Sequence, residues 1–470
     1  MDVPIKTNIN KKIKYLAFIK TYGCQQNVSD SEKIENVLSA MGYQITNVKE
    51  EADFIIFNSC AVRKNAELRV FGNVSQLRKL KKKKPNIVIA ICGCMTQQSH
   101  IVKKIRKDFE FVDIIFGTNT IEILPKLIKS VFLKRDIKNK KFAQNFKDIN
   151  FKPFEILQKT DISIENLPCK KENKIKTFIS IMHGCNNFCS YCIVPYVRGR
   201  ELSRKSESLL QEFEKLVKTG CKEITLLGQN VNSYGKTLDK KISFTELLRL
   251  LTKIEGDFRI RFMTSHPKDV SKELIDEIVS NKKICKHIHL PVQSGSNKIL
   301  EKMNRKYTRE KYLKIIDYTR KKAPELSFTS DIIVGFPSET YQDFEETLSL
   351  VKEAKFSSLF TFIYSKRKGT LAADMRDNVP YQTKIQWLNE LLKIQKNISS
   401  NFYQKFLGKR VRVLLEKEKN KKNIAFGKNS ENLTVYIEDC SEFLLGKFVQ
   451  VKIISQNNRV LRGKILHKNS

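Results

Sequence analysis

The sequence predicts an α/β protein with three domains: an N-terminal parallel α/β domain, a central partial (βα)6 barrel and a C-terminal small β-barrel. Apolar strand-like runs alternate with helical patterns along most of the chain, which indicates parallel βαβ units. After about residue 403 the pattern changes to short β-rich runs with glycines between or within them. The 470 residues are enough for about three domains, each with its own core.

The first domain, expected over residues 12–133, contains three strand–helix units. We expect strands at residues 14–23, 54–57 and 87–91, because each is a short apolar run. A helix should begin at the Ser29–Glu32 capping box and reach about Met41, and a second should run from about Asn65 to Lys82. This order predicts a parallel sheet with helices on its faces.

Three cysteines lie at the carboxyl ends of these strands: Cys24, Cys60 and Cys94. In an open α/β sheet, ligands bind at that edge, so the three thiols can converge on one metal site. Cys92 stands two residues before Cys94 and could compete with it. We choose Cys94 because it lies past the strand in a glycine-bearing turn. The alternative is that each cysteine is a small buried apolar residue.

Residues 134–174 are expected to be a linker, because the segment is charge-dense and rich in Asn, and Pro153 and Pro168 interrupt it. Cys169 lies there and is expected to have no role.

The central domain, expected over residues 175–402, repeats the strand–helix unit six times. Each strand runs into a polar or glycine-bearing segment, which predicts a partial barrel with its site at the carboxyl mouth. The expected strands are residues 177–182, 223–227, 259–263, 287–290, 328–334 and 359–364.

A second cysteine set follows the first barrel strand. Cys185, Cys189 and Cys192 stand at C-x3-C-x2-C spacing. Thiolates are soft ligands suited to iron–sulfur clusters or zinc, but a structural zinc site usually has four ligands. Three thiolates on a cubane cluster leave one iron open, and this spacing resembles the signature of radical S-adenosylmethionine (SAM) enzymes, in which that iron binds SAM. Zinc with His183 as fourth ligand, or three unrelated cysteines, are the alternatives.

Two glycines follow barrel strands: Gly228 after the second and Gly335 after the fifth. A glycine lets the backbone approach a ligand closely, so we expect both to contact SAM. The alternative is that they are ordinary turn glycines. We assign no chemistry to His266, His287 or His289.

The C-terminal domain, expected over residues 403–470, has predicted strands at 411–415, 433–437, 448–454 and 460–466. It carries 15 Lys and Arg against 6 Asp and Glu. Small basic β-barrels commonly bind nucleic acid through backbone charge and aromatic stacking. A stability or oligomerisation module is the alternative. Four aromatic residues could stack on bases, although we expect most of them in the core: Phe426, Tyr436, Phe443 and Phe448.

The whole chain is basic, with 87 Lys and Arg against 50 Asp and Glu and a formal charge of +37. This favours a polyanionic partner such as nucleic acid, although part of the excess is solvated surface. Eleven cysteines without an export signal favour metal or redox use over disulfides. No apolar run approaches the ~20 residues of a membrane span, and the polar N-terminus lacks a secretory signal. We therefore expect a cytoplasmic protein without a membrane partner.

Over nearly its whole length the chain resembles the radical SAM methylthiotransferases, and its tail resembles a TRAM domain. Within that family it is most similar to the branch that modifies isopentenylated adenosine in tRNA. It departs from the usual pattern at Gln26, Ser59 and Thr96, where Met, Thr and Ala are common. The stretches that carry the resemblance are residues 21–27, 58–63, 93–95, 184–201, 227–234, 290–296 and 331–337.

The resemblance implies two 4Fe–4S clusters. Cys185, Cys189 and Cys192 would hold the SAM-binding cluster, with Tyr191 packing near the adenine of SAM. An auxiliary cluster that carries the sulfur to be transferred would be held by Cys24, Cys60 and Cys94.

The implied reaction is methylthiolation at carbon 2 of isopentenyladenosine next to the anticodon of tRNA, with two SAM molecules. The expected partners are tRNA, SAM, an electron donor such as a flavodoxin or ferredoxin, and iron–sulfur assembly proteins, and the chain is expected to be a monomer. The alternatives are a methylthiotransferase for threonylcarbamoyl-adenosine tRNA or for a ribosomal protein, and a non-catalytic zinc- or RNA-binding protein.

Overall fold

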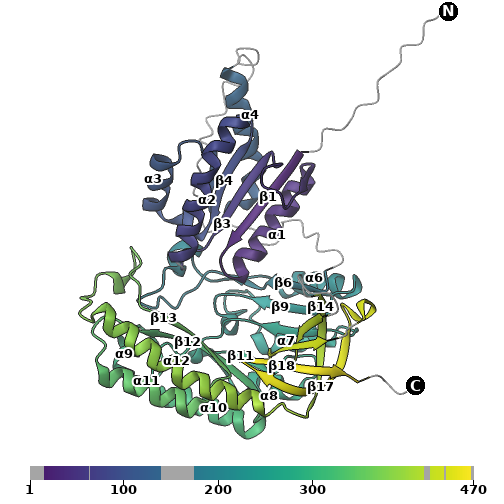
Figure 1. The fold of residues 1–470 in the computed structure, drawn as a ribbon, viewed down its shortest axis with the longest axis vertical. Coiled ribbons are helices and arrows are strands. Elements are labelled where there is room, and N and C mark those ends of the chain that lie inside the picture. Colours follow the sequence, from purple (N-terminus) through teal and green to yellow (C-terminus); the bar gives the residue numbers. More distant parts are fainter. Residues whose placement is uncertain (1–14, 63, 139–173, 418–423, 439–440, 467–470) are drawn as a thin grey trace, which may run out of the picture. The chain divides into compact units, whose positions relative to one another are not determined.

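The computed structural model describes residues 15–62, 64–138, 174–417, 424–438 and 441–466 (Figure 1). The chain divides into two compact units. The first is Met1–Lys170 together with Tyr196–Arg198, and the second is Lys171–Pro195 with Gly199–Ser470. Most of the predicted linker, including Cys169, lies outside the described residues. Among the residues described, no helix is both long and apolar enough to cross a membrane.

The first unit contains a five-stranded parallel sheet in the order β2-β1-β3-β4-β5. The strand order reverses between β1 and β3, which is where open α/β sheets form their ligand crevice. The sequence predicted β1, β3 and β4 but missed the three-residue strands β2 and β5. The bounds are β1 Tyr15–Tyr22, β2 Tyr43–Ile45, β3 Phe54–Ser59, β4 Val88–Gly93 and β5 Ile114–Phe116.

Helices cover both faces of this sheet (Figure 1). Helices α1 (Gln25–Ala40) and α4 (Leu124–Lys138) pack on one face, and α2 (Lys64–Lys83) and α3 (Ser99–Asp108) on the other. Helix α4 continues past residue 133, where the domain was expected to end.

Helix α1 begins at Gln25, not at Ser29 as predicted, because Cys24 is its N-cap and the Asn27 side chain bonds back to the Cys24 backbone N–H at 3.4 Å.

The second unit contains the six predicted barrel strands in sequence order, which confirms the partial (βα)6 barrel. Strands β6, β9 and β10 form one parallel sheet and β11, β12 and β13 form another. A parallel bridge pairs Ile260 of β10 with Ile284, which precedes β11 in the chain. The bounds are β6 Lys176–Ser180, β9 Glu223–Leu227, β10 Arg259–Phe262, β11 His287–His289, β12 Ser327–Val334 and β13 Ser358–Ile363.

Helices pack against the outer face of these strands around one continuous apolar core. A short antiparallel pair, β7 (Met182–His183) and β8 (Leu202–Ser203), frames the loop that carries the second cysteine set. The helix bounds are α5 Val194–Arg198, α6 Ser206–Lys218, α7 Phe244–Lys253, α8 Lys272–Ser280, α9 Asn297–Lys302, α10 Arg309–Lys322, α11 Tyr341–Ala354 and α12 Tyr381–Gln404.

The C-terminal strands form a closed barrel in the order β14-β15-β16-β18-β17. The sequence missed β15. None of the four aromatic residues considered for stacking belongs to the barrel core, contrary to the expectation for most of them; Phe443 is 87% exposed. The bounds are β14 Arg410–Lys417, β15 Ile424–Lys428, β16 Thr434–Glu438, β17 Phe448–Asn457 and β18 Val460–Ile465.

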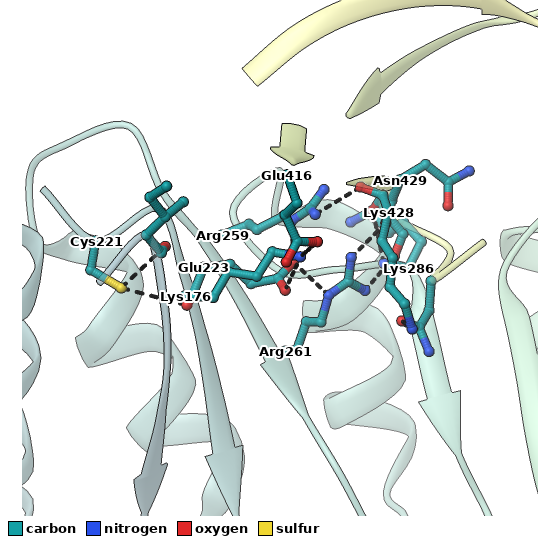
Figure 2. Close-up of polar contacts among 12 residues, drawn as sticks. Lys176, Cys221, Glu223, Arg259, Arg261, Lys286, Glu416, Lys428 and Asn429 are labelled. Atoms are coloured by element: carbon teal, nitrogen blue, oxygen red, sulfur yellow. Dashed lines mark hydrogen bonds and ion pairs between the residues drawn. The ribbon is translucent and has the colours of Figure 1, made fainter. Parts of the chain in front are cut away.

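A buried ion network fixes this small barrel to the central domain (Figure 2). The Glu223 carboxylate accepts hydrogen bonds from Arg259 at 2.6 Å and from Arg261 at 2.7 Å. These arginines donate in turn to the carbonyls of Lys428 at 2.8 Å and Asn429 at 2.6 Å. Glu223 and Arg259 are the first residues of β9 and β10. The small barrel therefore docks at the amino ends of the parallel strands, opposite the predicted site edge.

Candidate metal centres

The first cysteine set comes together at the carboxyl edge of the sheet in the first unit. Cys24 follows β1, Cys60 follows β3, and Cys94 follows β4. The Cys24 and Cys60 thiols are hydrogen-bonded to each other, and Cys94 interacts electrostatically with both. Cys92 instead packs in the apolar core beneath α1 and α4.

Hydrogen bonding and burial act on these thiols in different ways. The bond between Cys60 and Cys24 lowers the pKa of the Cys24 thiol, assisted by the charge of Arg198 and by backbone N–H groups at the start of α1. The same bond raises the pKa of the Cys60 thiol, and burial raises that of Cys94. Metal binding would therefore have to displace protons from Cys60 and Cys94.

An amide network holds the cysteine-bearing loops together. Asn27 Nδ2 donates to Asn58 Oδ1 at 3.1 Å, and Asn58 Nδ2 donates to the Asn27 carbonyl at 2.9 Å. Gly93 has a φ of +101°, and a Cβ there would lie 2.4 Å from Asn58 Oδ1. Glycine is thus required before Cys94 by backbone conformation and by space.

Sequence reasoning missed the arginine at this first set. Arg198 Nε donates to Cys94 Sγ at 3.2 Å, and its Nη2 donates to Asp30 Oδ2 at 2.7 Å. The Arg198 and Asp30 side chains are only 3% and 6% exposed. A buried guanidinium beside two of the three thiols suits an anionic group such as an iron–sulfur cluster. The sequence feature that could have drawn attention to Arg198 is its position six residues after Cys192.

The second cysteine set lies in the loop framed by β7 and β8. Cys189 and Cys192 interact electrostatically with each other and with Cys185. The Cys185 N–H donates to the Gly199 carbonyl at 3.1 Å, which closes the loop. Burial raises the pKa of the Cys185 thiol to about 11 and that of Cys192 to about 12, so these thiols are protonated until a metal binds.

A buried arginine also contacts this second set, and it too was missed. Arg305 Nη1 donates to Cys189 Sγ at 3.3 Å. The rest of its guanidinium is held by the Pro291 carbonyl at 2.8 Å and the Tyr307 hydroxyl at 2.9 Å. Each cysteine set therefore has one buried arginine that donates to a sulfur.

The other predicted SAM contacts have packing roles as well. Tyr191 packs against a small apolar cluster that contains Phe336, and burial raises its pKa. A Cβ at Gly228 would lie 2.6 Å from Met182, and one at Gly335, whose φ is +71°, would lie 2.4 Å from Lys384. Both glycines are thus explained by protein packing, and their contact with SAM stays a prediction.

Unpartnered polar atoms gather after the second and third barrel strands. These atoms are buried and lack hydrogen-bond partners among the described residues, which fits a polar ligand such as SAM at this edge. These atoms are Gln229 Oε1, Asn230 Oδ1, Asn232 Oδ1 and Nδ2, and Ser265 Oγ.

Each donor set offers three thiols, a ligand number that suits a cubane cluster with one open iron. Among the described residues, no three His, Cys, Asp or Glu side chains are grouped closely enough to hold a single metal ion. In a cluster, each thiolate binds a different iron, so its ligands need not converge on a single point.

Three family models match the chain. The radical SAM superfamily matches residues 179–351, the uncharacterized protein family UPF0004 matches residues 16–117, and the TRAM domain matches residues 404–466. The first two ranges contain the second and first cysteine sets respectively.

Curated relatives match nearly the whole chain. Proteins called tRNA-2-methylthio-N(6)-dimethylallyladenosine synthase are 49% identical in Clostridium botulinum (95% of this chain, 96% of the relative) and 47% identical in Thermoanaerobacter pseudethanolicus (98% and 94%). The one from Caldicellulosiruptor saccharolyticus is 46% identical (95% and 92%). Among solved structures, a radical S-adenosylmethionine methyltransferase from Kitasatospora setae shares the fold, with a TM-score of 0.54 and 10% identity over 77% of this chain and 75% of that one.

Proposed function

The chain belongs to the family of tRNA-2-methylthio-N(6)-dimethylallyladenosine synthases, and on that premise we propose that it methylthiolates carbon 2 of isopentenylated adenosine next to the anticodon of tRNA. The observation that carries the proposal is similarity of 46–49% identity that extends through both cysteine-bearing domains and the TRAM domain. The chain is a radical SAM enzyme that uses SAM and an iron–sulfur cluster.

We propose two clusters, each held by three cysteines. Cys185, Cys189 and Cys192 would hold the one that binds SAM, and Cys24, Cys60 and Cys94 the auxiliary one. Support comes from the two separate thiol sets, each at the carboxyl edge of a parallel sheet and each with a buried arginine donating to one sulfur. When bound, the clusters and SAM supply the radical, sulfur and methyl chemistry that replacement of an unactivated C–H bond demands.

The chain's own residues prepare this chemistry by burial and positioning. Cys185 and Cys189 are nearly inaccessible, and the loop around them is closed by the Cys185–Gly199 backbone bond. Exclusion of water protects reactive intermediates from quenching. The polar atoms that follow β9 and β10 would orient SAM, since no residue that the structure describes is their hydrogen-bond partner.

The TRAM barrel has two outward rows that suit single-stranded RNA. In the aromatic row, the Phe426 and Tyr436 rings lie 6.0 Å apart, and Arg462 is in register with Tyr436. The basic row consists of Arg410, Lys452 and Lys464, which are exposed and in register on β14, β17 and β18. Stacking surfaces flanked by cations bind nucleic acid with little sequence preference. The target base would have to leave the anticodon stack to reach the barrel mouth.

We further propose a cytoplasmic monomer that receives electrons from a flavodoxin or ferredoxin and its clusters from iron–sulfur assembly proteins. These proposals follow from the tRNA substrate and from the need to reduce the SAM-binding cluster. Loss of any one of the six proposed cysteine ligands should impair cluster loading.

Nucleoside mass spectrometry of tRNA tests the function. A deletion strain should lose 2-methylthio-isopentenyladenosine and accumulate isopentenyladenosine, and the wild-type gene should restore the modified base. The Cys189→Ala variant, expressed at the same level, should fail to restore it. Unchanged methylthio-isopentenyladenosine in the deletion strain, with loss of a methylthio group from another nucleoside or from a ribosomal protein, would reassign the substrate.

A further inference from the structure

The first cysteine set has an opposed pair of buried charges beside it. Arg198 donates from Nε to Cys94 Sγ at 3.2 Å and from Nη2 to Asp30 Oδ2 at 2.7 Å. Arg198 interacts electrostatically with Cys24 as well as with Cys94. The guanidinium therefore lies between a carboxylate and two of the three thiols.

One donor of this guanidinium has no partner in the part of the chain that the structure describes. Arg198 Nη1 is buried, and no described residue offers it a hydrogen-bond acceptor. A buried charged donor without an acceptor is costly, so a further acceptor is expected at this position. The sulfur atoms of an anionic cluster are acceptors of the required kind.

Asp30 fixes the guanidinium and also opposes its charge. Asp30 projects from the first turns of α1, the helix that Cys24 caps, and is buried at 4% exposure. Arginine stays charged under all ordinary conditions, so the pair contributes one permanent positive and one negative charge. Low local dielectric makes both charges effective at short range.

We infer that Arg198 and Asp30 are positioning residues that set the reduction potential of the auxiliary cluster in opposite directions. Hydrogen bonds to cluster sulfurs and nearby positive charge stabilise the reduced cluster, whereas a nearby carboxylate destabilises it. Arg198 therefore raises the potential and Asp30 lowers it. This inference rests on the proposed auxiliary cluster at Cys24, Cys60 and Cys94.

The test uses the full chain with the second cysteine set removed, Cys185→Ala/Cys189→Ala/Cys192→Ala, loaded anaerobically with iron and sulfide. Midpoint potentials are measured by redox titration followed by electron paramagnetic resonance. Arg198→Gln should shift the potential to a more negative value, and Asp30→Asn should shift it to a more positive one. Arg198→Lys keeps the positive charge but cannot donate to Cys94 and Asp30 with the planar geometry of a guanidinium. It should therefore give a smaller negative shift of the midpoint potential than Arg198→Gln.

Arg135→Gln is the matched control, because Arg135 forms a similar partly buried pair with Asp113 at 3.0 Å in the same unit. The midpoint potential of the Arg135→Gln variant should equal that of the parent protein, which lacks only the second cysteine set. The double variant Asp30→Asn/Arg198→Gln, which leaves no buried charge unpaired, should lie between the two single variants. Where Arg198→Gln fails to retain iron, the sign of the Asp30→Asn shift decides.

Shifts of the same sign in Asp30→Asn and Arg198→Gln, or unchanged potentials with iron retained, would overturn the inference. A parent that binds no cluster at all would instead reject the proposed auxiliary cluster. The two failures are therefore distinguishable, because iron content reports on the cluster and the sign of the shift reports on the charge pair.

Discussion

At the scale of single residues, the two cysteine sets have arginines that are held differently. Arg198 is paired with the Asp30 carboxylate. Arg305 is held by the Pro291 carbonyl and the Tyr307 hydroxyl, and within the described part of the chain no carboxylate forms an ion pair with it. Arg305 therefore brings an uncompensated positive charge to the loop that carries the second cysteine set.

The cysteine sets should divide the labour of the reaction. Cys60→Ala should still cleave SAM reductively to 5′-deoxyadenosine but should not insert sulfur into tRNA, because only the auxiliary site is disrupted. Cys189→Ala should lose both activities. The measurement is 5′-deoxyadenosine and methylthiolated nucleoside from the same reaction. Loss of SAM cleavage in Cys60→Ala would contradict this division.

Removal of the Arg305 charge should make the SAM-binding cluster harder to reduce. Arg305→Gln should slow reductive SAM cleavage by about tenfold, equivalent to about 1.4 kcal/mol, with iron content retained. Arg309→Gln is the control, since Arg309 bonds to Glu346 and Ser349 and contacts no cysteine. Equal rates in both variants would show that the Arg305–Cys189 hydrogen bond has no electrostatic role.

Sequence reasoning singled out the six cysteines because their spacing and their places at strand ends are local signals, and their role as cluster ligands stays a prediction. It could not find the arginines, whose partners lie far away along the chain. Arg198 and Asp30 are separated by 168 residues, and Arg305 and Cys189 by 116. Contacts of this kind depend on how loops fold back, which periodicity does not encode.

At the scale of elements, the errors in the predicted helices and strands have local causes. Helix α1 begins early because a cysteine N-cap with Asn27 replaces the more familiar Ser29 box. Strands β2 and β5 have only three residues, too few for alternation to show. Strand β15 contains Ala425 and Gly427, which have low strand preference. The barrel strands, including the three-residue β11, were predicted because strand-like runs and helical patterns alternate regularly there and each strand runs into a polar or glycine-bearing segment.

The ion network between the barrel strands and the TRAM domain should depend on Glu223. Glu223→Gln leaves Arg259 and Arg261 without their carboxylate and should destabilise the docking by about 3–5 kcal/mol. Hydrogen exchange should rise at the β15–β16 turn, residues 428–432. Glu273→Gln, which removes the exposed pair with Arg249, should leave the docking of the small barrel unchanged. Unchanged exchange at the turn in Glu223→Gln would refute the role of the network.

The same network predicts a pH dependence. Burial alone would raise the pKa of Glu223, but the charges of Arg261, Arg259 and Lys176 outweigh it and lower the pKa to about 2. A depressed carboxyl pKa stabilises the fold above the unfolded value, and that contribution is lost as pH falls from about 4.5 towards 2. The full loss, reached below pH 2, should be about 3 kcal/mol, and about 2 kcal/mol of it should appear by pH 3. Denaturant titrations at pH 7 and pH 3 should show this loss in the wild-type chain and a smaller loss in Glu223→Gln.

At the scale of the whole molecule, the charge of +37 predicts tRNA binding that weakens steeply with salt. Replacing the basic row, Arg410, Lys452 and Lys464, with glutamine should reduce the slope of log affinity against log salt by up to about 3, since each side chain can neutralise one phosphate. Filter binding from low to high salt measures it. The control replaces Lys79, Lys82 and Lys83 of α2 with glutamine, which removes the same number of charges from another domain. An equal reduction of the salt slope in this control would contradict a specific role for the basic row of the TRAM barrel.

The central claim is that six cysteines hold two clusters in separate sites, and anaerobic iron and sulfide analysis tests it most directly. The wild-type chain should bind about eight irons and eight sulfides, as two 4Fe–4S clusters require. The variants Cys24→Ala/Cys60→Ala/Cys94→Ala and Cys185→Ala/Cys189→Ala/Cys192→Ala should each bind about half of that amount. Zinc in place of iron, about four irons in the wild type, or a triple variant that keeps the full content would contradict the account.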